Sequence, residues 1–252
     1  MDLQLSFRKF EQPAYKNYDL VLGIDEAGRG SIAGPVSVSC VAFPKSFFDS
    51  KYSQKHIWLN LVDDSKKLNE KTREELFDYI IKNKIYFTNL LISAKIIDKF
   101  NINFAIEKAL LIFFRHLLLY KNYKKIKFFI DGNYSFLFKT IKEEINLIDE
   151  YSYKKYKNSI DLEISIKKNQ FTLSLESVVK GDQTVFSVAC ASILSKVIRD
   201  RYMKKISFLY PLYEFDKNKG YGTKKHIEVI HQLGYCVFHR RSYNISQQYK
   251  LF

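Results

Sequence analysis

The sequence predicts an α/β fold, a central mixed β-sheet flanked by helices and followed by a helical C-terminal part. Two β-rich segments stand near the N-terminus, short apolar strands and amphipathic segments then alternate, and two helical segments fill the C-terminal part. The chain has 252 residues, shows no internal repeat and contains no flexible linker. We therefore expect a single domain over residues 1–252, with a core over about residues 18–243.

The first strand is expected at Tyr18–Asp25, a β-rich apolar run. The second, Pro35–Phe43, alternates apolar and small polar residues, which is typical of a half-buried strand. Because a glycine-rich segment separates the two, we expect a turn between neighbouring strands. Apolar runs predict further strands at Ile85–Ser93 and Ile126–Asp131, and one more beginning at Leu173.

Helices are predicted from their apolar stripes and end signals. Asn69 is expected to cap a helix over Glu70–Lys84, because its side chain can accept a hydrogen bond from an N–H of the first turn. Three other helical segments are predicted: Ala94–Tyr120 (in two stretches), Gln183–Phe208, and Thr223–Leu233, which Gly234 ends. Residues from about 134 to 171 lack a clear period and are interpreted as an insertion, and residues 244–252 as a short C-terminal tail.

The composition narrows the class of partner and the compartment. Lys and Arg number 41 against 27 Asp and Glu, a net charge of +14 that favours a polyanionic partner, although an AT-rich genome also raises the lysine content. The cysteines Cys40, Cys190 and Cys236 form no C-x-x-C pair and are interpreted as small buried residues. No signal peptide is visible, and the apolar stretch Ala109–Tyr120 is too short to span a bilayer. We expect a cytoplasmic monomer with no membrane partner.

Four acidic residues stand at the ends of predicted elements. Asp25 and Glu26 end the first strand, Asp131 ends a later one, and Asp182 opens the long helix. Taken singly, each could be a turn former or a helix cap. If they converge, their repulsion favours bound cations, and carboxylate oxygens without His or Cys favour Mg²⁺ or Mn²⁺. Two such ions about 4 Å apart would clamp the attacking and leaving oxygens of a phosphodiester.

The adjacent pair Asp25 and Glu26 raises a geometric problem. Successive side chains of a regular strand point to opposite faces. Both acids can therefore reach one metal cluster only if the extended geometry breaks near Glu26. The segment "AGRG" (Ala27–Gly30) is expected to supply that break, because glycine admits positive φ.

A series of motifs resembles the ribonuclease HII family. They occur in the family's order and cover nearly the whole chain: Gly23–Val36, Asp63–Leu68, Ile130–Asn133, Val178–Met203, Asn218–Ile230 and His239–Tyr243. The resemblance implies the ribonuclease H-like fold and endonucleolytic cutting of RNA paired with DNA. It also implies incision on the 5′ side of single ribonucleotides in duplex DNA, leaving 3′-hydroxyl and 5′-phosphate ends, with roles in ribonucleotide and RNA primer removal.

The resemblance also assigns site residues. The family's metal-binding catalytic acids fall on Asp25, Glu26, Asp131 and Asp182, its glycine-arginine-glycine recognition loop on Gly28, Arg29 and Gly30, and its junction tyrosine on Tyr221. Glycine lets backbone groups approach a 2′-hydroxyl, which distinguishes RNA from DNA, and an arginine can grip a phosphate with two hydrogen bonds. "DSKKL" brings Ser65 and Lys66 either to the nucleic-acid backbone or into a solvated turn, and the sequence leaves both open.

Three alternative functions remain open. A hybrid nuclease like ribonuclease HIII would carry a sizeable N-terminal substrate-binding domain, whereas only about twenty residues precede the first predicted strand. A DNA junction resolvase would not need the recognition loop, and an inactive hybrid-binding module would typically lack one of the acids. Asp131 and Asp182 lie 51 positions apart, more than is common in the family, which the insertion explains.

The C-terminal tail suggests a second partner. Gln247 and Gln248 precede Tyr249, Leu251 and Phe252, which resembles the glutamine and the aromatic and aliphatic anchors of clamp-binding peptides with imperfect spacing. A sliding clamp is therefore a candidate partner for this tail.

Overall fold

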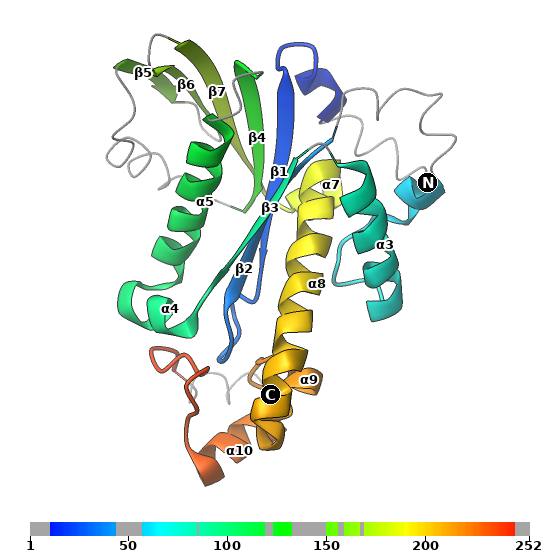
Figure 1. Cartoon of the computed structure of the whole chain (residues 1–252), viewed down its shortest axis with the longest axis vertical. Helices are drawn as coiled ribbons and strands as arrows, with labels where there is room; N and C mark the ends of the chain where they lie inside the picture. The colour runs from blue at the N-terminus through cyan, green and yellow to red at the C-terminus, as the bar shows by residue number, and fades with distance from the viewer. Residues whose placement is uncertain are drawn as a thin grey trace. The chain divides into compact units, whose positions relative to one another are not determined.

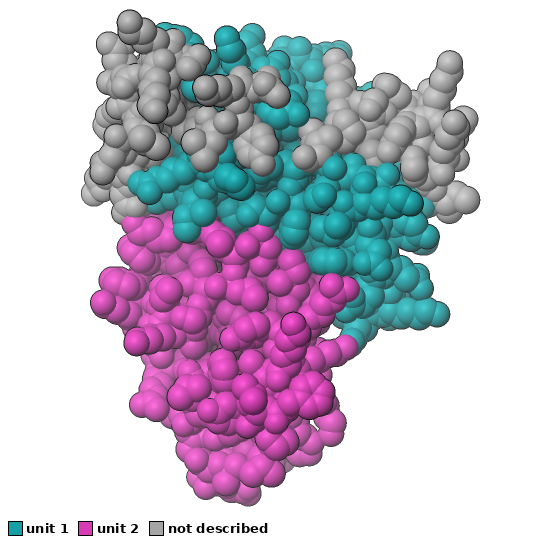
Figure 2. Space-filling view, viewed as in Figure 1, with its two compact units in different colours: residues 1–25, 39–88, 110–194 teal, residues 26–38, 89–109, 195–252 magenta. Residues whose placement is uncertain are grey.

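The structure is a computed structural model of the chain (Figure 1). It describes residues 11–43, 57–84, 86–118, 123–132, 150–155, 159–166 and 169–244. The chain divides into two compact units, coloured in Figure 2. Unit 1 comprises Met1–Asp25, Ser39–Thr88 and Leu110–Leu194, and unit 2 comprises Glu26–Val38, Asn89–Ala109 and Ser195–Phe252.

The described strands form one mixed sheet in the order β3-β2-β1-β4-β7-β6-β5. They are β1 (Leu20–Ala27), β2 (Val36–Ala42), β3 (Tyr86–Ile92), β4 (Lys125–Asp131), β5 (Glu150–Lys155), β6 (Ser159–Ile166) and β7 (Asn169–Val178). β4 pairs in parallel with β1 and with β7, whereas β6 pairs in antiparallel fashion with β7 and with β5. The predicted mixed sheet is confirmed.

β5 and β6 fall inside the predicted insertion of residues 134–171. β6 alternates apolar and polar residues in "SIDLEISI", so the period that the sequence analysis did not find is present. These strands extend the sheet beyond β7 through antiparallel pairing. Residues 133–149, 156–158 and 167–168 lie outside the described residues.

The helices agree with the predicted segments except at one position. They are α3 (Glu70–Asn83), α4 (Ala94–Phe100), α5 (Ile102–Leu118), α7 (Gly181–Thr184), α8 (Phe186–Leu209), α9 (Phe215–Asn218) and α10 (Lys224–Leu233), with 3₁₀ turns η2 (Ile57–Leu61) and η3 (Pro211–Tyr213). Asn69 caps α3 by accepting the N–H of Thr72 at 2.9 Å, as predicted. Thr223 caps α10 in the same way, and Gly234 ends that helix with a φ of +77°.

The prediction of one long helix from Gln183 to Phe208 was wrong at its start. Val185 has extended backbone, with φ −120° and ψ 118°, and separates the short helix α7 from α8. Val185 is β-branched, a residue class whose side chain favours extended backbone. Asp182 consequently lies in α7, a separate four-residue helix.

Unit 1 packs the start of α8 closely against β1. A Cβ on Gly23 would lie only 2.0 Å from the backbone carbon of Ser187, so only glycine fits there. The buried carboxylate of Glu11 accepts the N–H of Ser187 at 2.8 Å, which satisfies one unpaired donor at the start of the helix. The sheet and α8 are thereby fixed to each other within unit 1.

Unit 2 has its own apolar core. It is formed by buried residues of the segment after β1, of α8, and of the chain from η3 to the C-terminal loop: Ile32, Ala33, Met203, Ile206, Tyr213, Phe215, Ile227, Ile230 and Cys236. Tyr213 and Phe215 stack with ring centroids 5.5 Å apart. This core lies beneath the loop that carries Gly28, Arg29 and Gly30 in the sequence.

The three cysteines agree with the sequence prediction. Cys40, Cys190 and Cys236 are free and buried, as expected. None of the helices in the described part of the chain combines the length and the apolarity needed to cross a bilayer.

Candidate active site

Three of the four predicted acids lie toward the carboxyl ends of the neighbouring strands β1, β4 and β7 in unit 1. β1 and β4 run parallel, and Ile24 pairs with Ile130, so Asp25, which lies within β1, is level with Asp131, the last residue of β4. Asp131 in turn pairs with Val178, the last residue of β7, and Asp182 follows shortly after. Neighbouring strands are separated by about 4.8 Å. The register of β1, β4 and β7 therefore gathers these acids, as the sequence predicts.

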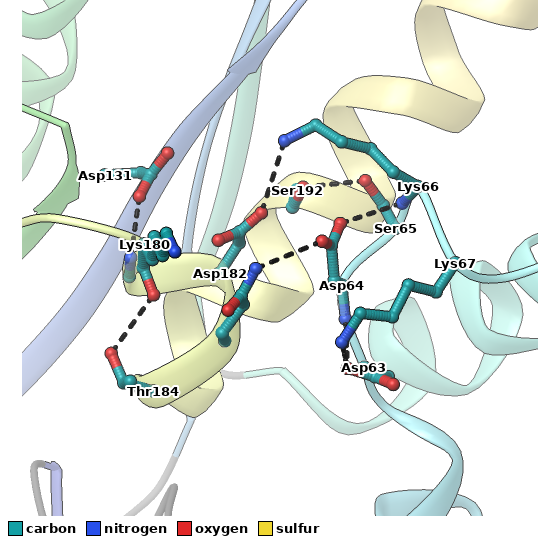
Figure 3. Close-up of polar contacts among 12 residues, drawn as sticks. Asp63, Asp64, Ser65, Lys66, Lys67, Asp131, Lys180, Asp182, Thr184 and Ser192 are labelled. Atoms are coloured by element: carbon teal, nitrogen blue, oxygen red, sulfur yellow. Dashed lines mark hydrogen bonds and ion pairs between the residues drawn. The ribbon is translucent and has the colours of Figure 1, made fainter.

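A tight connection between β7 and α7 positions Asp182. Lys180 has a φ of +58°, an uncommon left-handed conformation for a residue other than glycine. The N–H of Gly181 then donates to Oδ1 of Asp131 at 2.7 Å (Figure 3). A Cβ on Gly181 would lie 3.4 Å from the same oxygen, an ordinary contact, and 3.2 Å from Cγ1 of Val188, a tight one. Asp131 and Asp182 are thus tied through the backbone between them.

The electrostatics of Asp182 show an excess of negative charge. Asp182 is 3% exposed. Burial raises the pKa of Asp182, the negative charge of Asp131 raises it further, and Asp64 adds a smaller effect of the same sign. The positive charge of Lys66 opposes these effects on the pKa of Asp182 only in part. A divalent cation at this position would relieve the repulsion.

The segment "DSKKL" packs against α7 and α8 within unit 1 and adds a further acid. Asp64 is 6% exposed and accepts hydrogen bonds from the side chain of Gln183 at 3.3 Å and from the N–H of Lys66 at 2.9 Å. The hydroxyl of Ser65 lies 2.9 Å from that of Ser192. Ser65 is buried, so its hydroxyl anchors the turn to α8. Asp64 was missed at the sequence level, although it directly precedes Ser65 and Lys66 in the same motif.

Lys66 directs its side chain toward the acids. Its Nζ lies 3.5 Å from Oδ2 of Asp182, while 79% of the lysine side chain is exposed (Figure 3). Burial alone would lower the pKa of Lys66, but the carboxylates of Asp182, Asp64 and Asp25 raise it above its ordinary value. Lys66 is therefore a local counter-charge for this group of acids.

Glu26, the fourth predicted acid, belongs to unit 2 and sits inside β1. The strand continues through Glu26 to Ala27, so the extended geometry does not break at Glu26 itself but within the predicted segment Ala27–Gly30. The break comes at Gly28, whose φ is +87°. Glu26 has a cationic neighbour, since its Oε1 lies 3.3 Å from Nη1 of Arg29.

The two glycines of the recognition loop have different surroundings. A Cβ on Gly28 would lie 2.0 Å from Nε of Arg199, so the space beside Gly28 is filled by this side chain of the same unit. Nothing lies within 4 Å of a Cβ on Gly30. The sequence argument that missing side chains open the backbone to a ligand therefore applies to Gly30, whereas Gly28 is needed for backbone conformation and packing.

Two buried arginines and a part-exposed tyrosine donate hydrogen bonds to the carbonyl groups of this loop. Arg199 donates to the carbonyl oxygens of Pro35 at 2.9 Å and Ala33 at 3.1 Å. Arg240 donates to the carbonyl oxygens of Gly34 and Arg29, each at 3.0 Å, and Tyr243 donates its hydroxyl to that of Arg29 at 2.8 Å. We call Arg199, Arg240 and Tyr243 the carbonyl clamp. The carbonyl clamp could not be predicted, because the main-chain carbonyl groups that it holds leave no signal in a sequence.

Tyr221 lies beside the carbonyl clamp and is 39% exposed. Its ring centroid is 5.7 Å from Nζ of Lys196 and 5.5 Å from Cζ of Arg199. The preceding Gly220 accepts the N–H of Ala33 at 3.0 Å, so the loop of Tyr221 is fastened to the loop after β1 within unit 2. Tyr221 thus presents an aromatic face flanked by positive charge.

Two buried histidines support the backbone of Tyr221. Their Nε2 atoms lie 3.1 Å apart, and Nδ1 of His226 lies 2.8 Å from the carbonyl oxygen of Tyr221. Nδ1 of His239 accepts the N–H of Cys236, so the network assigns the proton of His239 to Nε2. That N–H donates to His226, which in turn donates through Nδ1 to Tyr221. Both rings are neutral in this arrangement.

The donor set fits a hard divalent cation. Among the described residues, no group of three or more His, Cys, Asp or Glu side chains is arranged to hold a metal ion. Protein groups engage three predicted ligands instead, since Glu26 pairs with Arg29, Asp131 accepts a backbone N–H, and Asp182 pairs with Lys66. The ligand atoms are nevertheless carboxylate oxygens, and the pKa of Asp182 is raised by burial and by Asp131. Both features favour an ion such as Mg²⁺ or Mn²⁺.

Comparisons with known proteins agree with the sequence motifs. The family model described as Ribonuclease HII matches residues 22–246. A ribonuclease HII of Caldicellulosiruptor bescii is 37% identical over 229 residues, which cover 90% of this chain and 88% of that protein.

Solved structures support the fold. The ribonuclease HII of the PCNA:RNase HII complex from Archaeoglobus fulgidus has a TM-score of 0.59 and 22% identity, covering 89% of this chain and 95% of that one. Bst-RNase HIII in complex with Mn²⁺ has a TM-score of 0.62 and 17% identity, covering 94% of this chain and 71% of that one. These likenesses confirm the expected ribonuclease H-like fold.

Proposed function

The chain belongs to the ribonuclease HII family and is therefore an endoribonuclease of the ribonuclease H type, and from this premise we propose its substrate and chemistry. It hydrolyses the RNA strand of RNA–DNA hybrids and incises duplex DNA on the 5′ side of a single embedded ribonucleotide. The products carry 3′-hydroxyl and 5′-phosphate ends. The activity serves the removal of misplaced ribonucleotides and of RNA primers.

The observation that carries this proposal is the convergence of acids toward the carboxyl ends of neighbouring parallel strands. In unit 1, Asp25 lies within β1 and is level with Asp131 at the end of β4, and Asp182 follows the end of β7; Glu26 is the residue next to Asp25. We assign all four as ligands of Mg²⁺ or Mn²⁺. When bound, two such ions supply Lewis-acid stabilisation of the attacking and leaving oxygens of the phosphodiester. The acids hold the ions at a fixed place beside the scissile phosphate, which orients the reaction.

Substrate recognition is assigned to the loop after β1. The open space at Gly30 supports an approach of its backbone to the 2′-hydroxyl, the group that marks a ribonucleotide. The Arg29 side chain is 44% exposed, and its planar guanidinium suits a phosphate oxygen pair. Gly28 supplies the positive φ that turns the chain toward these groups.

Tyr221 and Lys66 complete the proposed substrate contacts. The part-exposed ring of Tyr221 stacks on the deoxyribose that follows the ribonucleotide and so favours an RNA-to-DNA junction. Lys66, with an exposed side chain, takes a backbone phosphate. Ser65, for which the sequence left a nucleic-acid contact and a solvated turn open, supports this contact by anchoring the turn through Ser192.

A sliding clamp is the protein partner that we propose for the C-terminal tail. Support comes from the glutamine and aromatic residues at its end and from the similar ribonuclease HII of Archaeoglobus fulgidus, which was solved with PCNA. The tail from residue 245 onward lies outside the described residues. Deleting residues 245–252 should abolish clamp binding and leave cleavage of a free duplex unchanged; clamp binding by the shortened chain would contradict this partner.

The function is tested with a DNA duplex that contains one ribonucleotide. We expect cleavage with Mg²⁺ or Mn²⁺, none with chelator, and none of a matched all-DNA duplex. Asp25→Asn should reduce turnover by at least about 10³-fold while duplex binding stays within about twofold. Asp78→Asn, an exposed acid on α3, is the matched control and should retain full activity. Cutting of the all-DNA duplex, or no cutting with either metal, would contradict the proposal.

A further inference from the structure

The ammonium group of Lys66 lies against Asp182, one of the predicted metal ligands in unit 1. It lies 3.5 Å from Asp182, and its pKa is raised by the carboxylates of Asp182, Asp64 and Asp25 after burial has lowered it. Asp131 acts on the same Asp182. At this distance the ammonium group neutralises part of the charge of Asp182, the same charge that a bound cation would neutralise.

The turn that carries Lys66 is fixed, whereas its side chain is not. The N–H of Lys66 is held by Asp64 at 2.9 Å, and the carbonyl oxygen of Ser65 accepts a hydrogen bond from Arg73 at 3.0 Å. The hydroxyl of Ser65 contacts that of Ser192. Because the lysine side chain is 79% exposed, rotation of its aliphatic stem can withdraw the ammonium without moving the backbone.

The next residue of the motif provides an internal comparison. Nζ of Lys67 lies 3.4 Å from Asp63, and the lysine side chain is 59% exposed. Asp63 is not among the acids that raise the pKa of Lys66 or of Asp182. Two adjacent lysines of equal charge thus have different partners, and only Lys66 acts on the predicted metal ligand.

We propose that Lys66 is a positioning residue whose ammonium group takes the place of a cation beside Asp182. It competes with the divalent metal ion for that carboxylate. The inference rests on the proposed metal site. In the free protein the ammonium neutralises Asp182, and a metal ion binds only when the ammonium leaves. A phosphate of the nucleic acid is the partner that draws it away, so nucleic acid and metal favour each other's binding by the same factor.

Metal binding without nucleic acid tests the competition directly. Mn²⁺ is titrated calorimetrically into the wild type, Lys66→Met, Lys66→Arg and Lys67→Met. We expect Lys66→Met to bind Mn²⁺ about fivefold more tightly than the wild type, as for the loss of one part-exposed ion pair. Lys66→Arg keeps the charge and should resemble the wild type, and Lys67→Met should change the affinity by less than about twofold. Matching Tm values in chelator would show that each variant is folded.

The outcomes separate this inference from the proposed function. Unchanged or weaker Mn²⁺ binding by Lys66→Met would overturn the competition, and so would equal tightening by Lys66→Met and Lys67→Met, since that would reflect net charge alone. Absence of Mn²⁺ binding by every protein would contradict the metal site itself. The readout is binding, so it does not depend on cleavage.

Discussion

The carbonyl oxygen of Arg29 accepts hydrogen bonds from both Arg240 and Tyr243, at 3.0 Å and 2.8 Å. These donors fix the backbone of the residue that is proposed to contact phosphate, while its guanidinium stays 44% exposed. Arg240 also donates to the hydroxyl of Tyr243 at 3.2 Å, so the two donors support each other. At the scale of single residues, the recognition loop is thus preorganised through main-chain carbonyl groups.

Tyr243→Phe removes the hydrogen bond that Tyr243 donates to Arg29 and the one that it accepts from Arg240, without removing the ring. A neutral hydrogen bond contributes about 1 kcal/mol, so we expect KM for the ribonucleotide-containing duplex to rise about fivefold at most while kcat stays nearly constant. Steady-state kinetics on that duplex measure both constants.

Tyr235→Phe is the matched control for this prediction. Tyr235 is part-exposed and packs edge-on against His239 with ring centroids 5.3 Å apart. Its hydroxyl makes no described hydrogen bond, so the kinetics should not change. Equal effects of Tyr243→Phe and Tyr235→Phe would contradict the role of the carbonyl clamp.

At the scale of elements, the turn after β1 contains two glycines that differ in their surroundings. Gly28→Ala forces a side chain into a φ of +87° and against Arg199, so we expect a loss of about 1–3 kcal/mol in the free energy of unfolding. Gly30→Ala meets open space and should leave stability within about 0.5 kcal/mol. Denaturant unfolding of both variants measures this difference.

The same pair separates folding from recognition. If the backbone of Gly30 approaches the 2′-hydroxyl, Gly30→Ala should lower kcat/KM for the embedded ribonucleotide although the protein is fully folded. A fully active Gly30→Ala would refute the proposed approach. A stable Gly28→Ala would refute the packing argument.

The pair His226 and His239 joins α10 to the C-terminal loop and makes stability depend on pH. Burial and the neighbouring His226 lower the pKa of His239 from 6.5 to about 4. Between these values the unfolded chain binds a proton that the folded chain does not, so stability is fully present above pH 6.5 and is lost as pH falls toward about 4. Burial also lowers the pKa of His226, which adds an effect of the same sign.

Thermal unfolding from pH 7.5 to 4 measures this dependence. We expect Tm of the wild type to fall across the window, and His239→Asn, which removes the titrating group, to show a smaller fall. An equal fall in the wild type and in His239→Asn would contradict the assignment of this pH dependence to the buried histidine.

Elements with a strong period or an end signal could be predicted from the sequence, whereas contacts between distant segments could not. The strands that carry Asp25 and Asp131 follow from apolar runs, although β1 extends two residues beyond Asp25, and the Asn69 cap follows from one residue. The break at Val185 was missed because a single β-branched residue is a weak signal within an otherwise helical pattern. Asp64, which joins the other acids across a long sequence separation, could not be recognised by spacing alone.

At the scale of the whole molecule, family membership and the register of one sheet lead to the same residues. Motif order alone assigns four acids, and the pairing of β1, β4 and β7 independently brings three of them to one edge. The positive charge of the chain, +14, suits the polyanionic substrate that we propose for this site.

The position of the cut in a duplex with one ribonucleotide tests the central claim most directly. The strand containing the ribonucleotide is labelled at its 5′ end, incubated with Mg²⁺, and compared with markers that end on either side of the ribonucleotide. We expect a single product that ends in a 3′-hydroxyl on the DNA residue 5′ to the ribonucleotide. A product that retains the ribonucleotide at its 3′ end, or cuts spread over the DNA, would contradict the account.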